Sequence, residues 1–412
     1  MNAQTVFYLF IGFIVLEFIV EQYLDWRNAR HFNDPVPAEL NDIFDANEYQ
    51  KAQAYKKVNY RFSSITSFVS FALILLILFT GGFAWLNRLV MRITENPLLQ
   101  SLYFFGILLL ASSIFNLPFS YYRTFVIEER FGFNKSSRKL FFTDQIKSLL
   151  ISILLGGILM SAMILFYQKT GKNFWWYAWI VLAVFSILIN MFYTSLIVPL
   201  FNKLNPLDEG ELKEKLLKLA RKVSYNLDKI YVIDGSKRSS KANAYFSGFG
   251  PKKKVVLYDT LIEDLSPDEI TAVLAHEIGH YKKKHIIYNL LISLLTTGIM
   301  LYLLSLMIDS PVMAQALGVR QPAFHTGLIA FALLFTPVSF VLGIFSNWLS
   351  RKFEYQADDF ARKHHNAQAL ISGLKILSKN NLSNLTPDDW YVKVHYSHPT
   401  LLQRIRNLKR IR

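Results

Sequence analysis

Residues 271–280 read Thr271-Ala272-Val273-Leu274-Ala275-His276-Glu277-Ile278-Gly279-His280. This stretch contains the pattern H-E-x-x-H, in which two histidines stand four residues apart and a glutamate follows the first. On a helix, positions i and i+4 lie on one face, so His276 and His280 can bind the same metal ion. One zinc ion suits two imidazole nitrogens and keeps a position open for water in catalytic sites. Glu277 is then the expected general base.

The residues before this pattern predict that it lies on a helix. Ser266-Pro267-Asp268-Glu269 forms a capping box, with proline at the first helical position and acidic residues in the first turn. Ile270, Val273 and Leu274 then recur at helical spacing. The plain alternative is a chance match to a short pattern. The agreement of the cap, the helix and a third ligand argues against chance.

A third ligand is expected in residues 350–358, which follow the last long apolar stretch without a helix breaker. Two predicted spans separate this segment from the first motif, so both lie on the same side of a membrane. Glu354 would complete the two-histidine, one-glutamate set of many metalloproteases. Asp358, one helical turn further on, would accept the free N–H of a ligating histidine. The alternative is a solvated acidic face that pairs with Arg351 or Arg362.

Composition places this chemistry in a membrane protein. The chain has 412 residues, of which 52% are hydrophobic, and a mean hydropathy of +0.25. There is no cysteine, so disulfides and thiolate metal sites are excluded. The net charge is +15. Such a charge could reflect nucleic-acid binding, or the excess of lysine and arginine that membrane proteins carry in their cytoplasmic loops. No nucleic-acid-binding motif is present, so the bilayer is the expected partner.

The predicted fold class is a mainly helical, polytopic membrane protein. Seven apolar stretches are long enough to span a bilayer, or nearly so, at about 5–23, 64–86, 98–119, 146–167, 174–200, 286–308 and 325–349. The first lacks a basic n-region and a small-residue cleavage site, which favours a retained anchor over a signal peptide. Glu17 interrupts it and is expected to face the bundle interior or water.

Loop charges predict the orientation. Basic residues are concentrated in the loops after the first and third spans, whereas the alternate loops are poor in them. The first group is Arg27, Arg30, Lys51, Lys56, Lys57, Arg61, Arg123, Arg130, Lys135, Arg138 and Lys139; the second is Arg88, Arg92, Lys169, Lys172 and Arg320. The N-terminus is therefore expected outside and the C-terminus inside the cell. The predicted units are 1–200 with five spans, a protease part at 201–285, two spans in 286–349, and a cytoplasmic segment at 350–412.

The insertion at 201–285 is expected to hold an amphipathic helix at 211–224 and strands at 229–233 and 254–258. Asn243-Ala244-Tyr245-Phe246 is a third candidate strand, which would turn at 248–251 into the next strand and make a small hairpin sheet. Such an edge strand can bind an extended peptide through main-chain hydrogen bonds. The metal-binding helix is expected to continue through Lys282–Lys284 into the sixth span.

Several longer stretches form motifs that are more specific than H-E-x-x-H. They are Phe125-Val126-Ile127-Glu128-Glu129-Arg130-Phe131-Gly132-Phe133-Asn134, Ile230-Tyr231-Val232-Ile233-Asp234-Gly235-Ser236-Lys237-Arg238-Ser239-Ser240, Asn243-Ala244-Tyr245-Phe246, Val273–His280, Phe353-Glu354-Tyr355-Gln356-Ala357-Asp358 and His398-Pro399-Thr400. With these motifs the chain resembles the type 1 CAAX prenyl endopeptidase family of seven-span zinc metalloproteases. The resemblance runs through most of the chain.

This resemblance implies a fold and an activity. The fold is seven helices around an intramembrane chamber, capped by a zincin-like α+β protease domain. The implied ligands are His276, His280 and Glu354, with Glu277 as the base. The resemblance also implies that His398 and Arg404 approach the active site and that Asn243 lies on the substrate-binding strand. Eukaryotic members remove the last three residues of prenylated CAAX sequences.

The chain lacks insertions found in those members, so a bacterial source is expected, in the inner membrane. Its substrate would be a peptide or protein, with or without a lipid, and analogy adds a role in the quality control of membrane proteins. The intramembrane site-2 proteases fit less well, because the only Asp-Gly pair, Asp234-Gly235, precedes the histidines. A second alternative is a seven-span transporter or receptor with a structural zinc. Structural sites usually have four protein ligands, and three are expected here.

Overall fold

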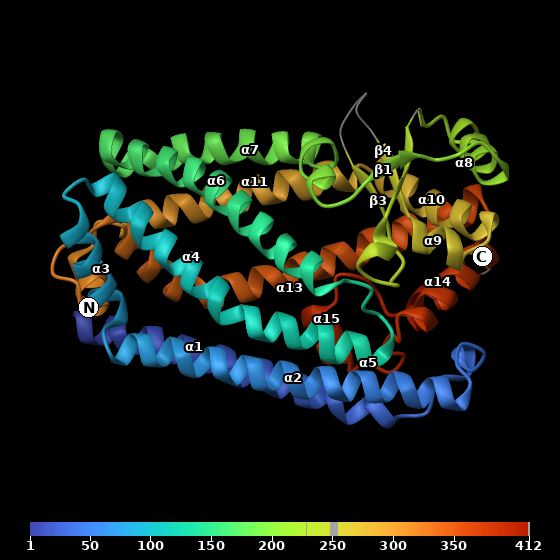
Figure 1. Ribbon diagram of the computed structural model, residues 1–412, viewed down its shortest axis with the longest axis horizontal. Helices are drawn as coiled ribbons and strands as arrows, with labels where there is room; N and C mark the ends of the chain where they lie inside the picture. The colour runs from blue at the N-terminus through green and yellow to red at the C-terminus, as the bar shows by residue number, and fades with distance from the viewer. Residues whose placement is uncertain (228, 248–253, 411–412) are drawn as a thin grey trace.

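The computed structural model describes residues 1–227, 229–247 and 254–410. Figure 1 shows an elongated bundle of long helices with a small sheet and shorter helices gathered at one end. The N-terminus lies at the opposite end of the bundle from the sheet. The bounds of the long helices are α1 Ala3–Arg30, α2 Ala46–Phe79, α4 Pro97–Tyr122, α6 Arg138–Thr170, α7 Phe174–Leu196, α11 His285–Met307 and α13 Phe324–His364.

These helices confirm a mainly helical membrane protein. Six described stretches are long and apolar enough to cross a membrane. One of them, Arg138–Leu196, contains both α6 and α7, which a short turn at Gly171–Asn173 connects. The number of seven spans therefore stays a prediction, as does the intramembrane chamber. Each predicted span overlaps one long helix, although the second ends earlier than expected.

The second predicted span, 64–86, is wrong at its C-terminal end. Helix α2 stops at Phe79, and Gly81 adopts a left-handed conformation with φ of 67°. Glycine adopts this conformation without the steric cost that a Cβ atom brings. A separate helix, α3 (Gly82–Ile93), then begins in a new direction and packs on α4. The hydrophobicity of residues 64–86 alone does not predict this turn.

The sheet is mixed and has four described strands in the order β1-β2-β4-β3. Their bounds are β1 Leu204–Pro206, β2 Ile230–Ile233, β3 Ala244–Ser247 and β4 Lys254–Tyr258. The expected hairpin between β3 and β4 is antiparallel as predicted, but β2 pairs with β4 in parallel. The strand β1 was not predicted, because it has only three residues. The turn predicted at 248–251 lies outside the described residues.

Shorter helices connect the long ones, and most of them gather near the sheet, whereas the one at Pro311–Ala316 packs on α1 and α13. They are α5 Glu129–Phe131, α8 Glu211–Lys222, α9 Asp259–Asp264, α10 Pro267–Lys282, α12 Pro311–Ala316, α14 Ala367–Asn380, α15 Asp389–His395 and α16 Leu401–Lys409. One buried apolar cluster joins α8, α10, α14 and α16 to the sheet. Leu216, Ile270, Leu274 and Ile278 are among its most buried side chains. This core holds α10 in place at the end of the bundle.

The metal-binding helix does not continue into the next span, and that prediction was wrong. Helix α10 ends at Lys282, and Lys284 has a φ of 59°, after which α11 begins at His285. A lysine seldom adopts this left-handed conformation, so tertiary packing must enforce it. The break redirects the chain and buries His285, which is only 1% exposed.

Candidate metal centre

Helices α10 and α13 cross at very short range next to the predicted ligands. A Cβ atom on Gly279 would lie 3.0 Å from the Cα of Ala357 and 3.0 Å from the Cβ of Phe360. Such distances leave no room for a side chain, so glycine permits the close approach of the two backbones. This crossing brings residues from α13 alongside the histidines of α10.

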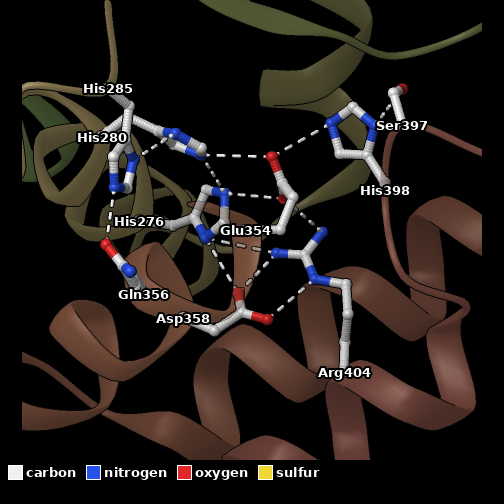
Figure 2. A network of polar contacts seen from close by, with 9 residues as sticks. All are labelled: His276, His280, His285, Glu354, Gln356, Asp358, Ser397, His398 and Arg404. Atoms are coloured by element: carbon white, nitrogen blue, oxygen red, sulfur yellow. Dashed lines mark hydrogen bonds and ion pairs between the residues drawn. The ribbon is translucent and has the colours of Figure 1, made fainter. Parts of the chain in front are cut away.

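Three side chains converge where the helices meet, as Figure 2 shows. His276 Nε2 lies 3.2 Å from His280 Nε2 and 3.3 Å from Glu354 Oε2. His280 Nε2 lies 3.2 Å from Glu354 Oε1. For tetrahedral zinc with bonds of about 2.0–2.1 Å, neighbouring ligand atoms stand about 3.3 Å apart. The separations therefore fit one metal ion bound by all three side chains.

The buried state of Glu354 and Asp358 rules out the solvated acidic face. Glu354 is 4% exposed and Asp358 is 0% exposed. The Oε2 atom of Glu354 is buried and has no hydrogen-bond partner among the described residues. A buried carboxylate oxygen is costly without a partner, and a metal ion would supply one.

Asp358 holds His276 in the orientation that ligation requires. Its Oδ1 accepts from Nδ1 of His276 at 2.8 Å, which leaves Nε2 free to face the centre. Arg404 donates to both Asp358 oxygens, at 2.6 and 3.0 Å. Burial and the Arg404 charge lower the pKa of His276, but the hydrogen bond to Asp358 and the nearby Glu354 carboxylate outweigh them and raise it to about 9. Because a ligating imidazole is neutral, metal binding will release this proton.

The second histidine has a corresponding arrangement that sequence reasoning missed. His280 Nδ1 lies 3.1 Å from Nδ1 of His285, and His285 Nε2 lies 2.9 Å from Oε1 of Gln356. An amide oxygen only accepts, so His285 carries its proton on Nε2 and accepts from His280. This leaves Nε2 of His280 free for the metal. Phe353 stacks on His285 with ring centroids 4.1 Å apart. The sequence signal that could have indicated this contact was the position of His285, nine residues after His276.

Several of the other predicted residues line one cavity with His276 and Glu354. Its volume is about 190 Å³, and its polar walls are Asn243, His276, Glu277, Glu354, His398 and Arg404. His398 Nε2 lies 3.2 Å from Glu354 Oε1, and its Nδ1 lies 2.9 Å from the Ser397 hydroxyl. Glu277 and His398 thus face the same space as the ligands, and Arg404 reaches it from α16.

The candidate substrate strand also borders this cavity. Asn243 and Ala244 contribute to its wall. Residues Ala244–Ser247 form β3, the outermost strand of the sheet. Tyr245 pairs with Val256 of β4, and Phe246 pairs with Val255. The strand therefore leads directly into the site with one edge unpaired by the other described strands.

Comparisons with known proteins agree with this geometry. The family model described as CAAX prenyl protease N-terminal, five membrane helices, matches residues 25–203, and that of peptidase family M48 matches 206–412. The chain is 37% identical to CAAX prenyl protease 1 homolog of Oryza sativa subsp. japonica, over 96% of each chain. It is 35% identical to CAAX prenyl protease 1 of Saccharomyces cerevisiae, over 96% of this chain and 94% of that one. The crystal structure of S. mikatae Ste24p superposes with a TM-score of 0.94 at 35% identity, covering 98% and 99% of the two chains.

Proposed function

Because this chain belongs to peptidase family M48 and is therefore a membrane metalloprotease, we propose that it uses one zinc ion to cleave prenylated CAAX C-termini. The observation that carries the proposal is the convergence of His276, His280 and Glu354, of which His276 and Glu354 line one cavity with Glu277. Zinc fits this set, because two imidazoles and one carboxylate are a common catalytic combination. A transporter with a structural zinc would not need a base in the same cavity.

Each side chain has a distinct task in peptide hydrolysis. When bound, the metal polarises a carbonyl group and lowers the pKa of water. Glu277 takes a proton from the attacking water and passes it to the leaving amine. His398 donates from Nε2 to the oxygen that becomes negatively charged during the reaction. Arg404 acts through Asp358, which fixes the orientation of His276.

The substrate would bind as an additional strand on β3. Main-chain hydrogen bonds to this edge hold any extended peptide, so they provide affinity without much sequence preference. Asn243 and Ala244 lie at the cavity wall, where the scissile bond must be presented. Tyr245 and Phe246 continue the edge away from the site.

The relatives named CAAX prenyl protease 1 support a lipid-modified protein substrate. We place the site on the cytoplasmic face because the loops beside it are basic. The relatives compared above are a plant and a yeast protein, so they lend no support to a bacterial inner membrane or to a quality-control role. The bacterial source rests on the absence of insertions alone, and the quality-control role rests on analogy alone.

The direct test uses the purified full chain and two peptides that differ only in prenylation of the CAAX cysteine. Cleavage positions are read by mass spectrometry, with and without a zinc chelator. We expect release of the C-terminal tripeptide from the prenylated peptide, loss of activity with chelator, and recovery with added zinc. Cleavage that persists in chelator would contradict the metal role. Equal cleavage of both peptides would show that prenylation of the substrate is not required, and the proposed peptidase activity would still stand.

A further inference from the structure

His398 lies beside the metal centre, but little in its own surroundings fixes its position. Its side chain is 62% exposed, and its Nε2 lies 3.2 Å from Oε1 of Glu354. Its Nδ1 lies 2.9 Å from the hydroxyl of Ser397, a neighbour that is itself exposed (Figure 2). Residues 396–400 connect α15 to α16. The backbone of this connection therefore determines where Nε2 of His398 lies.

Two side chains of α13 hold the end of α15, where the connection begins. A helix has no N–H groups of its own for the carbonyls of its last turn. Asn347 Nδ2 donates to one of them, the Val394 carbonyl, at 2.7 Å. Arg351 donates to three further carbonyls, those of Val392 and Lys393, both at 3.1 Å, and that of Tyr396. The last of these belongs to the connection itself.

The chemistry of Arg351 suits this task. Its hydrogen bonds all go to carbonyl groups, and none goes to the acidic residues of α13. A positive charge at the C-terminal end of a helix is favourable, because the unpaired carbonyls there carry partial negative charge. The planar guanidinium directs its N–H groups in a fixed fork, which the single ammonium group of lysine cannot reproduce.

The same face of α13 also bears on the metal centre. Four of its residues recur at spacings of four, three and four, which places them on one side of the helix: Asn347, Arg351, Glu354 and Asp358. Asp358 Oδ1 accepts from Nη2 of Arg404 at 2.6 Å, and Arg404 belongs to α16. Both ends of the connection are thus tied to the helical face that supplies the third proposed ligand.

We propose that Arg351, assisted by Asn347, is a positioning residue that holds His398 at the metal centre. Neither residue lines the cavity of about 190 Å³, so both act through the backbone of residues 392–396. Because α13 also carries Glu354, one rigid helix sets the distance between His398 and the ligand. The inference rests on the proposed role of His398 as donor to the oxyanion, and it adds the residues that deliver this donor.

The test compares Arg351→Met with Arg362→Met in the zinc-loaded full chain. Methionine keeps an apolar stem and removes the N–H donors. Arg362 is the matched control, since it lies on the same helix and also donates to a carbonyl, that of Arg410 at 3.0 Å. The measurements are kcat and KM for the prenylated peptide, zinc per mole of protein, and the midpoint of thermal unfolding.

We expect kcat of Arg351→Met to fall about 10- to 100-fold, because a displacement of about 1 Å can cost that much. Zinc content and KM should stay at their wild-type values, and Arg362→Met should match the wild type throughout. Arg351→Lys keeps the charge without the fork, so its kcat should lie between the two. Wild-type kcat in Arg351→Met, or loss of zinc from the folded variant, would overturn the proposal.

A double-mutant cycle separates positioning from a general structural role. If Arg351 acts through His398, then Arg351→Met should cost little further activity once His398→Phe is present. An equal fold-loss in both backgrounds would overturn the proposal and leave the peptidase standing. Full activity of His398→Phe alone would overturn both the positioning role and the oxyanion donor. Absence of cleavage by the wild-type chain would overturn the peptidase as well.

Asn347→Ala keeps the question decidable if Arg351→Met does not fold. This variant removes one hydrogen bond, to the Val394 carbonyl. We expect kcat to fall about two- to tenfold with unchanged zinc content, as for the loss of a single hydrogen bond. The loss should again disappear in the His398→Phe background. Unchanged kcat in Asn347→Ala would then overturn the proposal.

Discussion

Glu277 and Glu354 have the same side chain, and we propose different tasks for them at the metal centre. Glu354 is the proposed buried ligand, so Glu354→Ala should lose most of its metal together with its activity. Glu277→Gln keeps the shape but removes the base, so it should retain metal while the rate falls about 10²- to 10⁴-fold. Asp358→Ala should bind metal about 10- to 100-fold more weakly. The measurements are metal per mole of purified protein and the cleavage rate of each variant.

Full metal content in Glu354→Ala would disprove the assignment of the third ligand. Loss of metal from Glu277→Gln would place that residue among the ligands instead. Both variants are predicted to be inactive, but only Glu277→Gln is predicted to keep its metal. Misfolding would not produce this difference in metal content. Misfolding would remove the metal from both.

At the residue scale, the sequence predicted the parts of the site that follow helical spacing. His276 and His280 are one turn apart, and so are Glu354 and Asp358, so each pair could be assigned to one face. His285 could not be assigned in this way. Its contact with His280 depends on the turn at Lys284, whose left-handed backbone is imposed by packing and not by its own preference. Gln356 depends on the same turn, because its partner is His285.

The crossing of α10 and α13 gives a prediction at the scale of the element. Gly279→Ala places a methyl group about 3.0 Å from the α13 backbone, so the helices must separate. We expect a stability loss of about 1–3 kcal/mol, as for other overpacked cores, together with weaker metal binding. Gly343→Ala is the matched control, since a Cβ atom there meets nothing within 4 Å. The measurements are thermal unfolding and competition for metal with a chelator.

Equal behaviour of these two glycine variants would contradict the close approach as the reason for glycine at 279. Loss of stability with unchanged metal affinity would separate helix packing from ligand placement. Either result is informative, because Gly279 lies between the two histidines and yet binds no metal itself.

Elements with strong local signals were predicted well. Ser266 and Glu269 do form the capping box that begins α10, and the apolar runs do form long helices. The strand β1 and the helices α14 to α16 were not predicted. Helices α14 and α16 are stabilised by the apolar cluster they share with α10 and the sheet, whereas β1 pairs with β2 and α15 packs on α13. Tertiary contacts of this kind leave little trace in a local pattern.

At the scale of the whole molecule, the proposed orientation can be tested by labelling. The chain has no cysteine, so single cysteines give a clean background. Lys169, Lys283 and Arg320 are all exposed. Cysteines at Lys169 and Arg320 should react with an impermeant reagent added to intact cells, and one at Lys283 should react only after lysis. External labelling of Lys283→Cys would reverse the orientation and move the site to the other face.

The ligands also have an order of appearance during synthesis. His276 and His280 precede α11, whereas Glu354 lies near the C-terminal end of α13 and Arg404 lies further on in α16. A ribosome that has completed α10 has therefore made two of the three ligands. The three proposed ligands cannot meet until translation has passed Glu354, which lies in the C-terminal part of the 41-residue helix α13. The order of the ligands along the chain therefore means that the complete three-ligand set forms only after most of the membrane helices have been made.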